Sequence, residues 1–160
     1  MQIYDKSGNV IASSVPPESR IFDNMVIRDA HMVDLELEGM SFSRSDLSGS
    51  DFSGSDLYGS ILDETNMSQC KMQGVDFRYS YIDEVSFCGA DLRNARFSRD
   101  EVGGVLRLRA VDFTGANLEG ADFSDAIYDA ATVFPEGFDP EQRGMIKLED
   151  WEREHPLPSR

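Results

Sequence analysis

Two pairs of adjacent carboxylates are the residues of this chain whose type and spacing could do chemistry. Asp63-Glu64 and Asp83-Glu84 stand twenty residues apart in the sequence. Paired carboxylates can act as general acid and base, or they can hold a divalent cation. On an exposed face they can also bind a partner or keep the surface solvated. Which of these applies depends on the element that carries them.

Catalysis is disfavoured by what accompanies these carboxylates. The chain has only two histidines, His31 and His155, and they are far apart in the sequence. It contains no nucleophile–base pair, no glycine-rich phosphate loop and no cluster with metal-ligand spacing. We therefore expect a protein that is not an enzyme and that has no cofactor and no metal site.

The composition limits the classes of partner. The 160 residues are the length of one domain, and their net charge is −15. Such acidity argues against direct binding to nucleic acid or to an anionic membrane surface. No apolar run is long enough to span a membrane, and the first residues do not form a signal peptide. Cys70 and Cys88 are predicted to face different directions without a disulfide, so we expect a cytoplasmic protein.

A five-residue period identifies the element that carries the carboxylates. From Phe22 to Phe97 every fifth residue is Phe, Leu, Ile or Met, and the pattern returns at Phe113, Leu118 and Phe123. The residue two places before each of these is mostly small. A helix or a straight strand would not keep such positions on one face, because their periods are about 3.6 and 2 residues. The chain must turn by a constant amount in each repeat, which predicts a solenoid of stacked coils.

Three repeats carry a resemblance to a known family. They are Ala90-Asp91-Leu92-Arg93-Asn94, Ala116-Asn117-Leu118-Glu119-Gly120 and Ala121-Asp122-Phe123-Ser124-Asp125. They resemble the A(D/N)LXX unit of pentapeptide repeat proteins, and the register covers roughly residues 20–130. The resemblance implies an all-β fold, a right-handed quadrilateral parallel β-helix with four repeats in each coil. Residues twenty apart would then stack on one side. We expect a bacterial member of this family.

Both ends of the repeat region are expected to be capped, because an open β-helix exposes its edges. Residues 1–19 predict an N-terminal hairpin cap and a linker. Residues 131–160 predict a short helical C-terminal cap and a tail, with Asp139 as the N-cap of one helix and Leu148 and Trp151 on a second. In one interpretation Trp151 packs on its own chain. In the other it makes a dimer contact, so the protein is a monomer or a homodimer through its C-terminal end.

Residues 98–110 interrupt the register. Continuing the count would place Arg107 at a buried centre, so the pattern predicts an eleven-residue insertion at a corner, with the phase restored at Phe113. The segment carries Arg99, Arg107 and Arg109 beside several apolar residues. It is either an ordered corner that covers its own apolar residues or a recognition loop.

The predicted stacking assigns the carboxylates to one side of the solenoid. The central residues of that side are Phe42, Leu62, Ile82 and Phe113. Its outward residues include Ile61, Asp63, Glu64, Tyr81, Asp83, Glu84 and Asp112. Like charges stacked on neighbouring strands repel one another and cost stability. The side is therefore either a solvated surface or an acidic, partly apolar face that binds a protein partner.

These observations predict a non-catalytic protein-interaction scaffold that binds its partner through the acidic face. The resemblance supplies an alternative, because some pentapeptide repeat proteins protect DNA gyrase from inhibitors and are described as mimics of duplex DNA. The predicted rod carries roughly −0.4 elementary charge per Å, against about −0.6 for duplex DNA. The alternative is thus a topoisomerase (gyrase)-binding DNA mimic that confers protection or inhibition. An immunity factor or a purely structural module is the third hypothesis.

Overall fold

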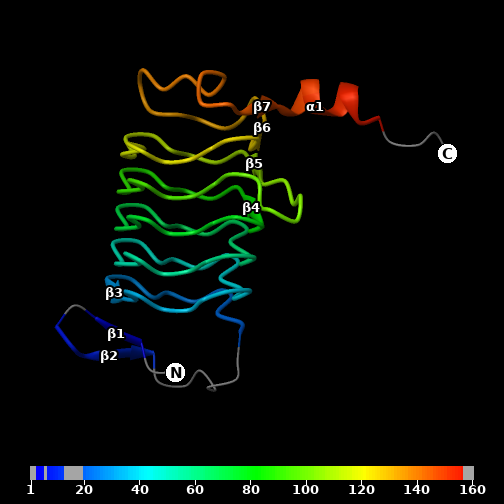
Figure 1. The fold of residues 1–160 in the computed structure, drawn as a ribbon. Coiled ribbons are helices and arrows are strands. Elements are labelled where there is room, and N and C mark those ends of the chain that lie inside the picture. The colour runs from blue at the N-terminus through cyan, green and yellow to red at the C-terminus, as the bar shows by residue number, and fades with distance from the viewer. Residues whose placement is uncertain (1–2, 6, 13–19, 157–160) are drawn as a thin grey trace.

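The chain folds into a stack of similar coils that follow one another along a single axis (Figure 1). The computed structural model describes residues 3–5, 7–12 and 20–156. Within the stack, parallel bridges join residues twenty apart, such as Ser41 with Ile61 and Ile61 with Tyr81. One bridge occurs in each five-residue repeat, so four repeats complete a coil. This is the predicted right-handed quadrilateral parallel β-helix.

Each corner of a coil is a β-turn that the five-residue period positions. The backbone N–H of the small residue donates to the carbonyl of the preceding central residue, as Ser45 does to Phe42 at 3.1 Å. The third residue of the turn has a positive φ, which glycine adopts without strain, as Gly49 does at 72°. Glu64 and Glu84 occupy this position with φ of 53° and 55°. Both glutamates therefore lie at corners rather than on a flat side.

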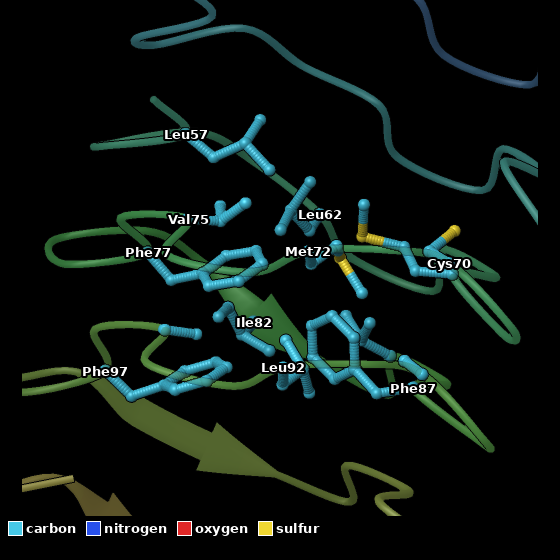
Figure 2. Close-up of a cluster of buried hydrophobic side chains, with 14 of the residues drawn as sticks. Leu57, Leu62, Cys70, Met72, Val75, Phe77, Ile82, Phe87, Leu92 and Phe97 are labelled. Atoms are coloured by element: carbon cyan, nitrogen blue, oxygen red, sulfur yellow. The ribbon is translucent and has the colours of Figure 1, made fainter. Parts of the chain in front are cut away.

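The central residues and the small residues fill the interior (Figure 2). On one side Phe77, Phe97 and Phe123 stack with ring centroids 4.8 and 4.7 Å apart. The hydroxyls in the small positions are buried, and they donate to backbone carbonyls of the preceding coil, as Ser45 Oγ does to Phe22 at 2.6 Å. No buried side-chain nitrogen or oxygen in the described part of the chain lacks a hydrogen-bond partner. Each coil therefore satisfies the polar groups that it buries.

The interruption of the register is shorter than predicted. Strand β4 (Ile82–Asp83) pairs in parallel with β5 (Arg107–Arg109), with Ile82 opposite Leu108. These partners are 26 residues apart, whereas partners in the earlier coils are twenty apart. The insertion therefore has six extra residues, and the predicted length of eleven is wrong. Its last part, Arg107–Arg109, is a strand of the β-helix and no part of a loop.

The prediction that the repeat resumes at Phe113 is also wrong, because the repeat resumes at Leu108. Leu106 and Leu108 are buried and occupy the small and the central position of the side that begins the next coil. Phe113 belongs to the following side, where its ring stacks on Phe87 with centroids 5.3 Å apart. Asp112 moves with it and pairs with Ser86, so it does not extend the predicted acidic face.

The N-terminal strands lie beside the first coil. Strand β1 (Ile3–Asp5) pairs antiparallel with β2 (Val10–Ala12) and also with β3 (Ala30–His31). Figure 1 shows this hairpin at one end of the stack. The linker that the sequence predicted after the hairpin, at residues 13–19, lies outside the described residues.

At the other end, β6 (Ile127–Tyr128) and β7 (Ile146–Lys147) extend the parallel sheet in the order β4-β5-β6-β7. Helix α1 (Leu148–Glu154) follows β7 and carries Trp151, as predicted. It extends beyond the outline of the stack on the side where the insertion projects (Figure 1).

The helix predicted to begin after Asp139 is wrong, because the residues that follow form turns. Asp139 Oδ1 still caps them, since it accepts hydrogen bonds from the N–H groups of Glu141 and Gln142 at 3.1 and 3.2 Å. In the described ranges, no helix combines the length and the apolar character that a membrane crossing needs.

Candidate interaction surface

The predicted carboxylates lie in one stack on what we call the carboxylate side. Its central residues are Phe22, Phe42, Leu62, Ile82 and Leu108. The Glu64 N–H donates to the Asp83 carbonyl at 2.9 Å, which places the Asp63-Glu64 corner directly beside the Asp83-Glu84 corner. The stack ends in a cation in both directions, because Arg44 pairs with Glu64 at 3.2 Å and Arg109 pairs with Asp83 at 3.3 Å. The acidic face is thus real but bounded.

The electrostatics of Asp83 reflect this crowding. Burial raises the pKa of Asp83 above its ordinary value, and the neighbouring Asp63 and Asp129 raise it further, while Arg109 opposes the shift. The pKa stays raised in spite of the ion pair, so the surroundings of Asp83 remain unfavourable to its charge. This agrees with the repulsion expected from stacked carboxylates.

Two apolar side chains stand beside the carboxylates. Ile61 is 43% exposed and Tyr81 is 65% exposed, and a parallel bridge joins them across neighbouring coils. An exposed tyrosine next to an exposed isoleucine gives the side an apolar strip flanked by charge. Such a strip with a polar rim is the usual composition of a protein-binding surface.

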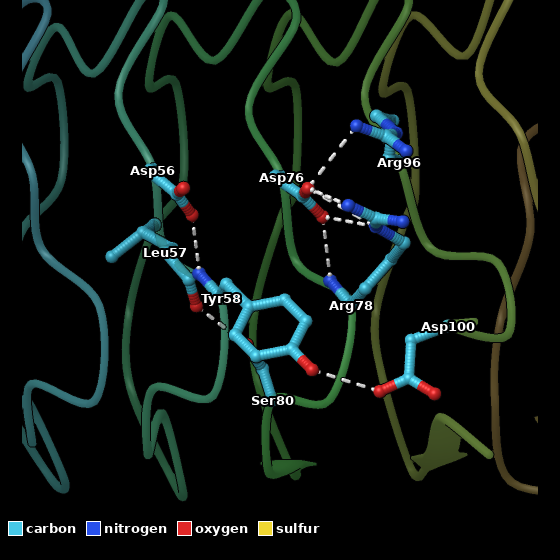
Figure 3. Close-up of polar contacts among 8 residues, drawn as sticks. All are labelled: Asp56, Leu57, Tyr58, Asp76, Arg78, Ser80, Arg96 and Asp100. Carbon is cyan, nitrogen blue, oxygen red and sulfur yellow. Dashed lines mark hydrogen bonds and ion pairs between the residues drawn. The ribbon is translucent and has the colours of Figure 1, made fainter. Parts of the chain in front are cut away.

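The insertion is held to the β-helix by a buried carboxylate (Figure 3). The Tyr58 hydroxyl donates to Asp100 Oδ2 at 2.9 Å, and the Gly104 N–H donates to Asp100 Oδ1 at 2.6 Å. Burial opposes ionisation of Asp100, but the hydrogen bonds from Tyr58 and the loop backbone prevail and lower its pKa. The ring of Tyr58 also stacks on Tyr79 with centroids 5.8 Å apart. These contacts fit the ordered-corner interpretation, although Val102 at the tip is 83% exposed.

The three arginines of the interruption have different surroundings. Arg99 remains on the loop, with its guanidinium near Gly103. Arg107 and Arg109 both project from β5, directly before and directly after the buried Leu108. Arg109 reaches Asp83, whereas Arg107 reaches the indole of Trp151, with its guanidinium carbon 4.6 Å from the ring centroid.

Trp151 is engaged within the chain. Besides Arg107, its ring stacks on His155 with centroids 4.6 Å apart. The contact with Arg107 links α1 to the same strand that carries Arg109. Residues from three separate hypotheses therefore meet around β4 and β5, namely Asp83 of the acidic face, Arg107 and Arg109 of the interruption, and Trp151.

Several carboxylates on the other sides of the β-helix are paired with cations. Asp76 accepts from Arg78 at 2.7 Å and also lies 3.3 Å from Arg96 (Figure 3). Burial raises the pKa of Asp76, but the hydrogen bonds and charge of Arg78 outweigh it, so the pKa is lowered. Asp91 is held mainly by Arg93, which lowers its pKa far below the ordinary range. The negative charge is thus locally compensated at these positions, although the chain as a whole keeps a net charge of −15.

The described part of the chain contains no cluster of three or more His, Cys, Asp or Glu side chains that could hold a metal ion. Cys70 is buried and its thiol contacts the Leu47 carbonyl at 3.1 Å, whereas Cys88 is half-buried on the surface. Neither forms a disulfide in this structure.

Two contacts of this surface were missed by the sequence reasoning. The bond from Tyr58 to Asp100 joins residues 42 apart, and no repeat pattern indicates it. The contact of Arg107 with Trp151 depends on the path of the chain after the last coil, which the period does not describe. The correct phase of β5 could have been found, because five residues before Phe113 is Leu108.

Comparisons with known proteins agree with this architecture. A family model described as pentapeptide repeats matches in eight copies, over residues 30–69, 41–79, 70–99 and 107–127. The gap between the last two ranges coincides with the insertion. The comparison with curated protein sequences gives no match.

Several solved structures are similar to the chain. A pentapeptide repeat protein from Nostoc Pcc 7120 is 27% identical with a TM-score of 0.50, over 81% of this chain and 85% of that one. A pentapeptide repeat protein from the Arabidopsis thaliana thylakoid lumen is 17% identical with a TM-score of 0.49, over 71% and 75% of the two chains. QnrB1, a plasmid-mediated fluoroquinolone resistance protein, is 20% identical with a TM-score of 0.44, over 89% and 92%.

Proposed function

Because the chain belongs to the pentapeptide repeat family, we propose that it is a non-catalytic scaffold that binds a protein partner through the carboxylate side. The observation that carries the proposal is the exposed pair Ile61 and Tyr81 beside Asp63 and Glu64. A rigid β-helix presents these side chains at fixed spacing, so little conformational entropy is lost when a partner binds.

The exposure of these side chains also bears on the proposal. Catalysis generally uses a deep, water-excluding site, whereas exposed apolar and charged side chains, such as Tyr81 at 65%, suit contact with another protein. We propose a cytoplasmic location because Cys70 and Cys88 are not expected to form a disulfide, and cell fractionation of the native host tests it.

The packing of Trp151 on Arg107 favours a role of Trp151 within the chain over a dimer contact, and light scattering of wild type and Trp151→Ala tests this.

The alternative, a DNA mimic that binds a topoisomerase, has weaker support. Its argument is the net charge of −15. A mimic of duplex DNA requires an unbroken series of anions, whereas Asp76, Asp83 and Asp91 each have an arginine partner. A gyrase supercoiling assay with and without a quinolone separates the two functions, and protection or inhibition at micromolar protein would favour the mimic.

The proposal is tested by capture of partners from an extract of the native host. We expect Ile61→Ser and Tyr81→Ser to abolish capture of the partners that wild type retains. Val26→Ser is the matched control, because Val26 is also an exposed apolar residue at the equivalent position of a neighbouring side. Retention of the same partners by the Ile61→Ser, Tyr81→Ser double variant would show that the carboxylate side is only a solvated surface.

A further inference from the structure

A small cavity lies on the carboxylate side at the foot of the insertion. Its volume is about 120 Å³, and β4, β5 and the loop contribute its walls. The functional groups around it are Tyr81, which directly precedes β4, Asp83 from β4, Arg107 and Arg109 from β5, and the apolar side chain of Val105. The cavity therefore combines two guanidinium groups with apolar surface, on a protein whose charge is otherwise strongly negative.

Arg107 is the group at this cavity that is prepared to bind an anion. Its guanidinium carbon lies 4.6 Å from the centre of the Trp151 ring, which covers one face of the guanidinium. Stacking on a face leaves the N–H groups at the edge free to donate in the plane, and it fixes the orientation of that edge. No carboxylate in the described ranges lies within ion-pair distance of Arg107, whereas Arg109 is already paired with Asp83 at 3.3 Å.

We propose that this cavity binds a carboxylate side chain from an acidic segment of the partner protein. The carboxylate accepts hydrogen bonds from two N–H groups at the edge of the Arg107 guanidinium. An apolar neighbour in the same segment packs on Tyr81 and Val105. The inference rests on the proposed function, because the cavity adjoins the apolar strip of the carboxylate side. It adds the chemistry of the bound group and the residue that recognises it.

A carboxylate fits this cavity better than a phosphate does. Asp83 borders the cavity, and Asp63 and Asp129 are close enough to raise the pKa of Asp83. Because Arg109 is already paired with Asp83, only the Arg107 guanidinium is available, and a phosphate dianion would bring a second negative charge that has no cation to match it. The single charge of a carboxylate can be matched by Arg107 alone.

The single tryptophan of the chain provides a local signal for the test. We propose to titrate the full chain with an octapeptide of alternating Glu and Leu, with the matched Gln and Leu octapeptide, and with inorganic phosphate. Binding is followed by Trp151 fluorescence and, independently, by calorimetry. We expect saturable binding of the Glu peptide only. Equal binding of the Gln peptide, or binding of phosphate without binding of the Glu peptide, would overturn the proposal.

Variants assign the effect to Arg107. Arg107→Gln is expected to weaken binding of the Glu peptide at least tenfold, and Arg107→Lys severalfold, because lysine keeps the charge without the planar pair of donors. Arg93→Gln is the control, because it removes the same charge from a different side, where Arg93 pairs with Asp91. Unchanged affinity of Arg107→Gln, or an equal loss in Arg93→Gln, would contradict the assignment to this cavity.

The peptide titration and the capture experiment fail independently. If the Glu peptide binds through Arg107 but Ile61→Ser, Tyr81→Ser still captures all partners, the proposed function is wrong. The cavity then binds a carboxylate, but not one that belongs to a protein captured by the carboxylate side. This result would overturn the inference that the ligand is a segment of the partner protein. If capture depends on Ile61 but the Glu peptide does not bind, the proposed function stands and the inference alone is wrong.

Discussion

Truncation of Phe97 to alanine tests how the stack of coils is stabilised. The Phe97 ring is fully buried and lies between Phe77 and Phe123, with centroids 4.8 and 4.7 Å away. It also meets Phe87 and Phe113 edge to face, at 6.1 and 5.8 Å. Because Phe97 is the last central residue before the insertion, its ring also connects the two parts of the β-helix.

The expected loss follows from these contacts. Truncation of a buried phenylalanine costs about 3–5 kcal/mol in unfolding free energy, and each aromatic pair is worth roughly 0.5–1.5 kcal/mol beyond its buried area. With four rings around it, Phe97→Ala should fall at the upper end, at about 4–5 kcal/mol. Phe22→Ala is the control, because Phe22 stacks on Phe42 alone in the first coil, at 5.2 Å. A terminal coil can fray without unfolding its neighbours, so we expect a loss smaller by about 1–2 kcal/mol.

Urea unfolding at 25 °C measures both variants. For a slope of about 2 kcal/mol per molar, the midpoint of Phe97→Ala should fall by roughly 2 M. Circular dichroism reports the β-helix and Trp151 fluorescence reports the C-terminal end, and coincident transitions would show that the stack unfolds as one unit. A loss below about 2 kcal/mol for Phe97→Ala, or a loss equal to that of Phe22→Ala, would refute this account of the core.

Three further predictions concern the carboxylate side and the insertion. Asp83→Asn should stabilise the protein by about 0.5 kcal/mol at pH 7. A raised folded-state pKa makes the ionised form costly, so this advantage should disappear in thermal unfolding as the pH falls through that pKa and below about 4. Tyr58→Phe removes a hydrogen bond to Asp100 and should speed tryptic cleavage after Arg99 at least threefold, with an unchanged rate contradicting the anchor. Deletion of residues 100–105 restores the twenty-residue spacing, so the circular dichroism spectrum should remain that of a β-helix. Deletion of residues 99–109 removes β5 and should lower the melting temperature markedly. Equal behaviour of the two variants would show that the phase of β5 is misassigned.

The sequence period was sufficient for the fold of the repeat region, because it is a property of every coil. A buried central residue, a small residue two places earlier and a turn just before that small residue determine which side chains face inward. The same logic placed Asp63 beside Asp83 and Ile61 beside Tyr81 correctly. What it could not supply was anything outside the repeat, including the anchor of the loop at Asp100 and the path of α1.

The error at the insertion has a physical cause. Six extra residues are one more than a repeat, so the phase shifts by a single position and a count from Phe97 reaches Arg107 where the structure buries Leu108. Counting back from Phe113 reaches Leu108 directly, but Leu106 two places earlier is too large to be recognised as a small residue. The consequence for the site is large, since Arg109 rather than Asp112 borders Asp83.

The insertion also bears on how the chain reaches its native arrangement. Coils of equal length and similar sequence can dock one coil out of alignment, and such slipped arrangements compete with the native state during the folding of repeat proteins. Among the described residues one step of the stack is 26 residues long, and Asp100 at the start of its extra residues meets Tyr58, which lies two coils earlier. A slipped stack would leave Asp100 Oδ2 buried without the hydrogen bond from Tyr58, which is costly. The irregular step therefore makes one alignment of the coils distinguishable from all others.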